Sequence, residues 1–278
     1  MSEIRARGSS LPTAEHCMRL WAARHRGAIG ISAEEWGIRP RRQHVGAAVG
    51  SSTHRGAEHM MTEFQRTGEV GGERRVKTAR EAALNRLSDD MRAGELTYDP
   101  VTTGPNGAVE AVSKMVAAYH ASIDPTRQPL LIEAGLSMTL AGTIVVTGHV
   151  DLWFVDGHGE DLKTGRNRPR ASSQYGAYSL LARAHGHKVK PTFRQRYLPR
   201  VPSGKPQPAP VISEFPQGAI EHQAVATAKA IRRSVEEFRA TGDPDSFLAN
   251  PNTWLCKDTL CPAWGSKWCH AWRMKEKS

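Results

Sequence analysis

Two short stretches in the middle of the chain decide the fold: Gly-His-Val-Asp at residues 148–151 and Gly-Glu-Asp-Leu-Lys-Thr-Gly at residues 159–165. Segments around them are rich in β-branched residues or alternate between apolar and polar ones, which is typical of strands. Asp-Gly at residues 156–157 is a strong hairpin signal because both turn positions tolerate positive φ. The sequence therefore predicts a three-stranded antiparallel meander over residues 130–140, 143–155 and 160–163.

This meander brings charged side chains together. Asp151 lies on the second predicted strand and Asp161 on the third, and Lys163 shares a face with Asp161 because strand side chains alternate. Two adjacent carboxylates repel each other, and a hard cation such as Mg²⁺ or Mn²⁺ relieves the repulsion. Such an ion activates water for phosphodiester hydrolysis, with Lys163 to orient the water or neutralise charge. The alternative is a surface hairpin with a cross-strand ion pair.

Helices are predicted on both sides of the meander, from apolar residues at helical spacing. Thr13 and Asn106 are the predicted caps of two of them. The predicted helices cover residues 12–26, 46–67, 73–91, the segment that Asn106 begins, 172–185 and 218–241, with two further strands at 188–198 and 211–215. From residue 242 onward the chain is predicted to be loop, because prolines interrupt it.

Further polar residues fall at predicted positions near the acidic pair. Gln174 and Tyr178 are four residues apart on the next helix and share one face of it. Glu133 lies on the first strand of the meander. His54 ends the string Gly-Ser-Ser-Thr-His on a predicted helix. A lone helical histidine is usually structural or solvated, so the weight of His54 comes from its combination with the others.

The order of these residues resembles the RecB-type exonuclease branch of the PD-(D/E)XK nuclease superfamily. A Gly-x-x-x-His helix precedes a glutamate strand, then Gly-x-Val-Asp, Asp-x-Lys-Thr-Gly and Gln-x-x-x-Tyr. The resemblance implies an α/β, restriction-endonuclease-like core: a central mixed sheet flanked by helices. It implies that a Mg²⁺ or Mn²⁺ ion is held by His54, Asp151 and Asp161. The catalytic residues that it implies are Lys163, Asp161, Asp151 and Glu133, and the residues that contact the substrate are Gln174 and Tyr178.

Four cysteines are placed unevenly, with Cys17 near the start and Cys256, Cys261 and Cys269 within the last 25 residues. One subgroup of the family, which includes AddB-type and CRISPR-associated RecB-like nucleases, has an iron–sulfur cluster with this one-plus-three arrangement. The resemblance implies a [4Fe–4S] cluster joining the two ends of the chain, although the triplet is spaced more widely than is usual. Zinc, with His270 as a substitute ligand, and inert buried thiols are the alternatives.

Together the matches predict one nuclease domain over residues 1–278, with a core at about 46–241 and an iron–sulfur cap formed by about 11–26 and 242–273. The tryptophans of the tail, Trp254, Trp264, Trp268 and Trp272, are expected to shield the cluster or, alternatively, to stack on bases.

DNA is the expected partner, because the net charge of +10 favours a polyanion. Basic runs occur at residues 39–42, 74–80, 166–170 and 188–200. The sequence contains no phosphate-binding loop of an ATP-driven motor, so any helicase or recombination protein is a separate partner. We expect a cytoplasmic protein with no membrane partner, because no apolar run is long enough for a span.

A metal-dependent DNA exonuclease is the predicted function. The alternatives are a non-catalytic DNA-binding module and an endonuclease with the same chemistry. Digestion polarity, strand preference, pathway and oligomeric state are not predicted.

Overall fold

The computed structural model describes residues 3–40, 43–94, 96–140, 142, 144–169 and 172–273. Parts of three predicted features lie outside these ranges. They are residues 41–42 and 170 of the basic runs, and residue 143 at the start of the second predicted strand.

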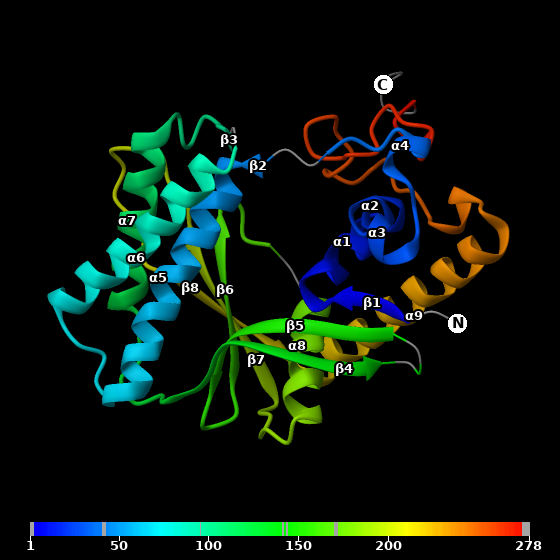
Figure 1. Cartoon of the computed structure of the whole chain (residues 1–278). Helices are drawn as coiled ribbons and strands as arrows, with labels where there is room; N and C mark the ends of the chain where they lie inside the picture. The colour runs from blue at the N-terminus through cyan, green and yellow to red at the C-terminus, as the bar shows by residue number, and fades with distance from the viewer. Residues whose placement is uncertain are drawn as a thin grey trace.

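A six-stranded mixed sheet forms the centre of the molecule (Figure 1). Its strands run in the order β1-β5-β6-β7-β8, and β4 pairs with β5 on the other side. The β1–β5 and β6–β7 pairs are parallel and the others are antiparallel, so the predicted mixed sheet and the antiparallel β4-β5-β6 meander are confirmed. The strands are β1 (Ile4–Arg7), β4 (Pro129–Leu140), β5 (Ile144–Phe154), β6 (Gly159–Gly165), β7 (Thr192–Pro199) and β8 (Val211–Pro216). A separate parallel pair joins β2 (Gln43–His44) to β3 (Leu96–Thr97).

Helices cover the sheet on both faces, as predicted. One face packs against α5, α6 and α7 through a cluster that includes Leu152, Leu162 and Leu198, and the other against α8 and α9 through Val150 and Phe193. The helices are α1 (Leu11–His16), α2 (Met18–Arg24), α3 (Arg26–Ile29), α4 (Ala33–Trp36), α5 (Val45–Thr67), α6 (Glu73–Arg92), α7 (Pro105–Ala121), α8 (Ser172–Ala184) and α9 (Gln217–Thr241). None of the helices in the described ranges has both the length and the apolar composition of a membrane span.

The predicted helix over residues 12–26 is wrong in one respect, because Cys17 interrupts it. Cys17 is extended, with φ −164° and ψ 110°, and separates α1 from α2. Its sulfur accepts hydrogen bonds from the backbone N–H groups of Leu20 and Asn250, at 3.4 and 3.5 Å. The break therefore directs the thiol towards the C-terminal segment.

Both predicted caps are also wrong. Thr13 lies inside α1, whose N-cap is Ser10, and Asn106 lies inside α7, whose N-cap is Gly104. Each helix begins earlier because it carries a proline near its start, where the missing N–H costs nothing. The strand predicted from residue 188 begins only at Thr192, and β1 was not predicted at all.

The N-terminal helices pack against the C-terminal segment, which is drawn in orange and red beside α2 and α4 (Figure 1). Arg19, only 4% exposed, joins the two. Its guanidinium donates to the carbonyl oxygens of Phe247 at 2.9 Å and Trp268 at 2.7 Å, and pairs with Asp245 at 2.5 Å. Because a buried guanidinium left without acceptors is costly, Arg19 ties residues far apart in the sequence firmly together.

Candidate active site

The candidate site forms where β5 and β6 separate. The two strands pair at only two positions, Leu152 with Glu160 and Trp153 with Gly159. Beyond that point the backbone N–H of Leu162 donates to the Asp151 side chain at 2.9 Å. The separation of the strands makes room for side chains between them, and this is the place where both aspartates of the predicted pair lie.

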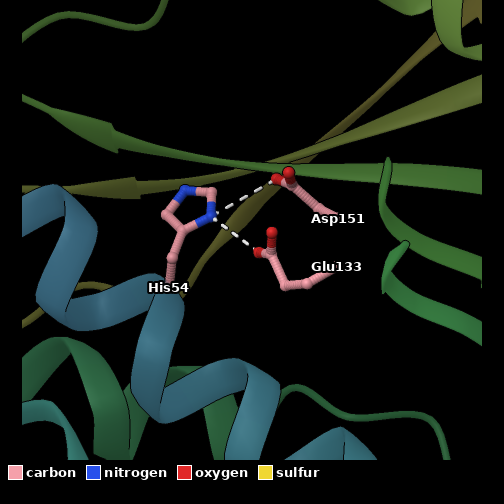
Figure 2. A group of neighbouring side chains, drawn as sticks. All are labelled: His54, Glu133 and Asp151. Atoms are coloured by element: carbon pink, nitrogen blue, oxygen red, sulfur yellow. Dashed lines mark ion pairs between the residues drawn. The ribbon is translucent and has the colours of Figure 1, made fainter. Parts of the chain in front are cut away.

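Three side chains from three elements converge on this fork (Figure 2). His54 extends from α5, Glu133 from β4 and Asp151 from β5. His54 Nδ1 lies 3.5 Å from Glu133 Oε1 and 3.5 Å from Asp151 Oδ2. One ligand atom of each residue lies within 4.8 Å of the other two, which is a spacing that a single cation can bridge.

Glu133 holds its position through an unusual backbone conformation. Its φ is 45°, and no other non-glycine residue in the described ranges has a positive φ. The flanking pairs, Ile132 with Leu152 and Ala134 with Val150, place it opposite Asp151. Left-handed backbone costs a non-glycine residue about 1–3 kcal/mol and tends to occur at functional sites. No sequence signal for this conformation exists, because glutamate gives no indication of positive φ.

A second group of side chains lies next to this trio. Lys163 Nζ is 2.9 Å from Oδ1 and 2.8 Å from Oδ2 of Asp161, and it donates to Gln174 Oε1 at 3.0 Å. Gln174 Nε2 lies 3.0 Å from Asp161 Oδ1 and 2.8 Å from the Tyr178 hydroxyl. The four predicted residues of β6 and α8 thus form one connected network, with Gln174 at its centre.

Asp161 belongs to this network and not to the trio of ligand atoms within 4.8 Å. Its side chain is fully buried, and burial raises its pKa while the Lys163 ammonium opposes that shift. Burial and the neighbouring Asp161 raise the pKa of Asp151 well above its usual range. Burial acts to lower the pKa of His54, but Asp151 and Glu133 raise it to about 9. Without a cation, the site therefore holds protons to offset its carboxylates.

A family model for the PD-(D/E)XK nuclease superfamily matches residues 8–270, which is nearly the whole chain. The chain belongs to the PD-(D/E)XK nuclease superfamily. Members of this superfamily are nucleases that use divalent metals. The trio of His54, Glu133 and Asp151 offers one imidazole nitrogen and two carboxylates, a donor set that suits such an ion. A comparison with curated proteins gives no significant match.

The absence of a side chain at Gly50 lets α5 pack close to the sheet. A Cβ added at Gly50 would lie 2.8 Å from Thr164 Oγ1 on β6, closer than real contacts allow. Gly50 is one turn before His54, so the close approach of the helix also sets the height of the imidazole above the fork. The Gly-x-x-x-His spacing of the sequence therefore has a steric cause in the structure.

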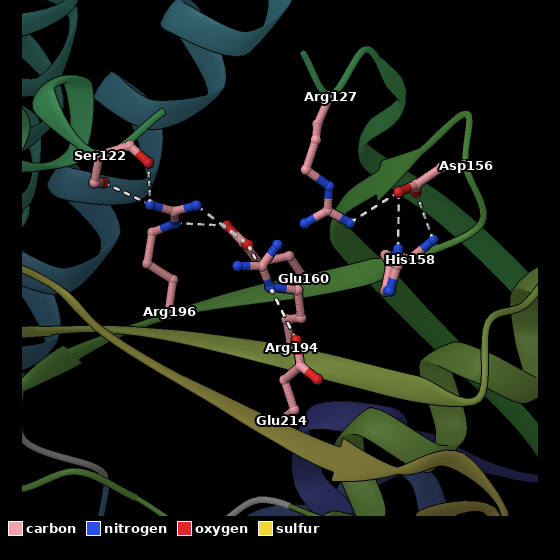
Figure 3. Close-up of polar contacts among 8 residues, drawn as sticks. All are labelled: Ser122, Arg127, Asp156, His158, Glu160, Arg194, Arg196 and Glu214. Atoms are coloured by element: carbon pink, nitrogen blue, oxygen red, sulfur yellow. Dashed lines mark hydrogen bonds and ion pairs between the residues drawn. The ribbon is translucent and has the colours of Figure 1, made fainter. Parts of the chain in front are cut away.

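Glu160, beside Asp161 in the sequence, has a buried structural partner in Arg196 (Figure 3). Arg196 binds its carboxylate at 2.6 and 3.2 Å and also donates to the carbonyl oxygen of Ser122 at 2.7 Å. Glu160 and Arg196 are 2% and 5% exposed. This buried pair ties β6 to β7 and the end of α7, and its Glu160 lines the same pocket as His54, Glu133 and Asp151. Sequence reasoning missed it, since nothing marks Arg196 as buried.

The four predicted cysteines line one pocket between α2 and the C-terminal segment, together with apolar residues such as Leu20 and Leu255. Their exposed fractions are 7–9%. Burial and the proximity of the other three cysteines raise the pKa of Cys261 to about 11, against the Ala263 N–H, which acts in the opposite direction. The structure thus brings Cys17 beside residues more than two hundred positions away.

Of the tail tryptophans, Trp268 is fully buried and packs against Phe238, Phe247 and Trp36. Trp254 is 61% exposed and lies edge-on to His16. The tail tryptophans therefore do not form one uniform apolar layer.

Proposed function

We propose that this PD-(D/E)XK superfamily member is a Mg²⁺- or Mn²⁺-dependent DNA exonuclease of the RecB-type branch. The observation that carries the proposal is the meeting of His54, Glu133 and Asp151 beside the Lys163 network at the fork of the sheet. The basic net charge of +10 supports a polyanionic substrate. A single nuclease domain extends over the chain in this proposal.

In the proposed site His54, Asp151 and Glu133 hold the cation. When bound, the ion supplies Lewis-acid polarisation of a phosphoryl oxygen and a water of lowered pKa. Asp161 is the further ligand that the family resemblance implies. In support, the charge of Asp161 acts on both His54 and Asp151.

Lys163 has two tasks in this proposal. Its ammonium lies against Asp161 and 3.0 Å from Gln174 Oε1, so the amide fixes its direction. From there it orients the attacking water or stabilises charge that develops on the phosphoryl oxygens. Gln174 and Tyr178 hold Lys163 and Asp161 in place, and they contact the substrate strand by the same resemblance.

Single-stranded DNA or DNA ends are the proposed substrates, in recombination, repair or CRISPR-type processing. Any helicase or recombination partner is a separate chain in this proposal.

The test is digestion of end-labelled single- and double-stranded oligonucleotides with Mn²⁺, beside closed circular DNA. An exonuclease shortens the labelled oligonucleotides in a ladder and leaves the circle intact. Cleavage of the circle would replace this proposal with the endonuclease alternative. Inert protein that still shifts the DNA would favour the non-catalytic binding module.

We further propose a [4Fe–4S] cluster held by Cys17, Cys256, Cys261 and Cys269. Convergence of the four thiols on one apolar pocket supports it. Zinc would take the same four thiolates, and the metal and sulfide content of the purified protein decides between the two.

A cluster in this place would join the two ends of the nuclease, which would otherwise be held by Arg19 and apolar packing. Protein purified without oxygen should be brown, contain iron and sulfide, and lose both when Cys256 is replaced by serine. A colourless protein with one equivalent of zinc would contradict the cluster.

A further inference from the structure

A broad groove of about 790 Å³ lies beside β1, away from the residues assigned to the site. Four arginines line it: Arg5 and Arg7 from β1, Arg24 from α2 and Arg26 from α3. Polar Ser9, Thr13 and Thr147 contribute to the same surface. The lining thus combines positive charge with hydroxyl groups, which are the donors that bind phosphate oxygens.

Strand register aligns this groove with the active site. β1 runs parallel to β5, with Arg5 opposite Val145 and Arg7 opposite Thr147. Ile4 and Ala6 are buried, so the two arginines point to the other, open face of the sheet. Thr147 precedes Asp151 by four residues on β5, a separation of about 13 Å.

The end of β1 also touches the catalytic network. β4 pairs along one edge of β5, so β1 and β6 share the other edge, at residues 144–147 and 152–153. Gly8, which follows Arg7, packs so closely on α8 that an added Cβ would lie 3.2 Å from the Tyr178 ring. Groove and site are therefore neighbours on one strand edge.

Part of the positive charge in the groove has no carboxylate partner among the described residues. Within the described part of the chain, Arg7 and Arg26 form no ion pair with a carboxylate, whereas Arg5 pairs with Glu3. His25, which lies between Arg24 and Arg26 in the sequence, also lines the groove and stacks on Trp21. Burial lowers the pKa of His25 to about 4, and Arg7 and Arg24 act in the same direction. The protein thus maintains a concentration of positive charge that a bound polyanion would offset.

We propose that this groove holds the phosphate backbone of single-stranded DNA on its way to Asp151. The proposal rests on the proposed nuclease function and extends it to the path of the substrate. Arginine suits the task, because its planar fork binds phosphate oxygens in pairs. The distance of about 13 Å corresponds to about four nucleotides of a helical strand at 3.4 Å each, and to fewer in an extended one.

The test measures binding of a labelled oligothymidylate by fluorescence anisotropy, without divalent metal, over a range of salt concentrations. The groove variant is Arg7→Ala with Arg26→Ala. Its charge-matched control is Arg233→Ala with Arg239→Ala, two exposed arginines on α9, outside the basic runs of the sequence. Loss of two phosphate contacts lowers the slope of log K against log salt by about 1.4, and at 0.1 M salt weakens binding about 25-fold. The control pair should bind as wild type does.

A second, independent test measures how affinity depends on the length of the oligonucleotide. Wild-type affinity should rise once the strand is long enough to reach from the site to the groove, and the groove variant should lose that increment alone. An affinity independent of length would reduce the groove to a single anion site and overturn the proposed path. Thermal unfolding checks that the variants fold, and Arg7→Ala alone is the milder substitute, because that side chain supports no described hydrogen bond or ion pair.

Two outcomes separate this inference from the function. If wild type cleaves DNA but the groove variant keeps both its affinity and its salt slope, the groove proposal is wrong and the nuclease stands. If wild type fails to cleave, yet binding depends on Arg7 and Arg26, the proposed function is wrong and the groove stands. An equal loss in the Arg233 and Arg239 control would overturn the groove, since general charge would then explain the binding.

Discussion

Replacing Gly50 with alanine tests how α5 carries His54 to the fork. The added methyl group would lie 2.8 Å from Thr164 Oγ1, against the roughly 3.5 Å that non-bonded heavy atoms prefer. Overpacking of this kind costs about 1–3 kcal/mol, while alanine in a helix interior gains about 1 kcal/mol over glycine. We therefore expect Gly50→Ala to be neutral or destabilising by up to about 2 kcal/mol.

Removing the Thr164 hydroxyl should reverse the effect of Gly50→Ala on stability. In a Thr164→Ala background the same Gly50→Ala change meets no hydroxyl and should stabilise the protein by up to about 1 kcal/mol. The coupling between the two positions is then about 1–3 kcal/mol, from a double-mutant cycle of urea unfolding. Gly218→Ala is the matched control, because an added Cβ there has open space.

Cleavage should report the same displacement. A shift of about 1 Å at a site residue can cost about 100-fold in rate, so Gly50→Ala should cut DNA about 10- to 100-fold more slowly. The double variant should recover most of that loss, because His54 returns to its place. Zero coupling in both stability and rate would refute the steric explanation of the Gly-x-x-x-His spacing.

The remaining predictions concern three other residues. Glu133→Gln removes one carboxylate from the trio and should weaken Mn²⁺ binding at least about 10-fold by calorimetry; unchanged affinity would remove Glu133 from the ligand set. Tyr178→Phe deletes the hydroxyl that accepts from Gln174 and should cost about 1 kcal/mol of stability, with a kcat loss smaller than that of Gln174→Ala. Burial acts to raise the pKa of Asp99, but Arg200 and the Thr102 N–H lower it to about 2. The pKa of Asp99 is lower in the folded state than in the unfolded state. The stability that the Asp99 carboxylate contributes is therefore complete above about pH 4 and is lost as pH falls towards 2. Asp99→Asn should therefore cost about 1–2 kcal/mol at pH 7, after allowance for solvent screening, and flatten the acid side of the stability curve; an unchanged curve would contradict the Arg200 pairing.

The sequence predicted the central part of the fold well, for physical reasons. Alternation and the Asp-Gly turn specify a meander locally, and long apolar periodicities specify α5, α6 and α9. The parallel β1–β5 pair could not be predicted, because Ile4–Arg7 is short and its partner lies about 140 residues away. Cys17 breaks the first helix through contacts with a distant segment, which helical periodicity does not register.

In the candidate site, too, some contacts follow from local sequence spacing and others depend on tertiary structure. Asp161, Lys163, Gln174 and Tyr178 lie close in sequence on a strand and the next helix, so their meeting follows from local spacing. The part that Glu133 plays depends on its positive φ, a tertiary effect without a local signal. The groove arginines were likewise not predicted as a binding surface, because the strand β1 that carries two of them was not predicted.

The central claim is that Lys163 and the carboxylates at the fork cut DNA with a divalent ion. The most direct measurement compares Mn²⁺-dependent digestion of end-labelled DNA by wild type and Lys163→Ala, with binding measured in parallel and Lys229→Ala as an exposed control on α9. We predict that Lys163→Ala cuts at least about 100-fold more slowly, binds DNA as wild type does, and that Lys229→Ala is unaffected. Equal digestion by wild type and Lys163→Ala would contradict this assignment of the active site.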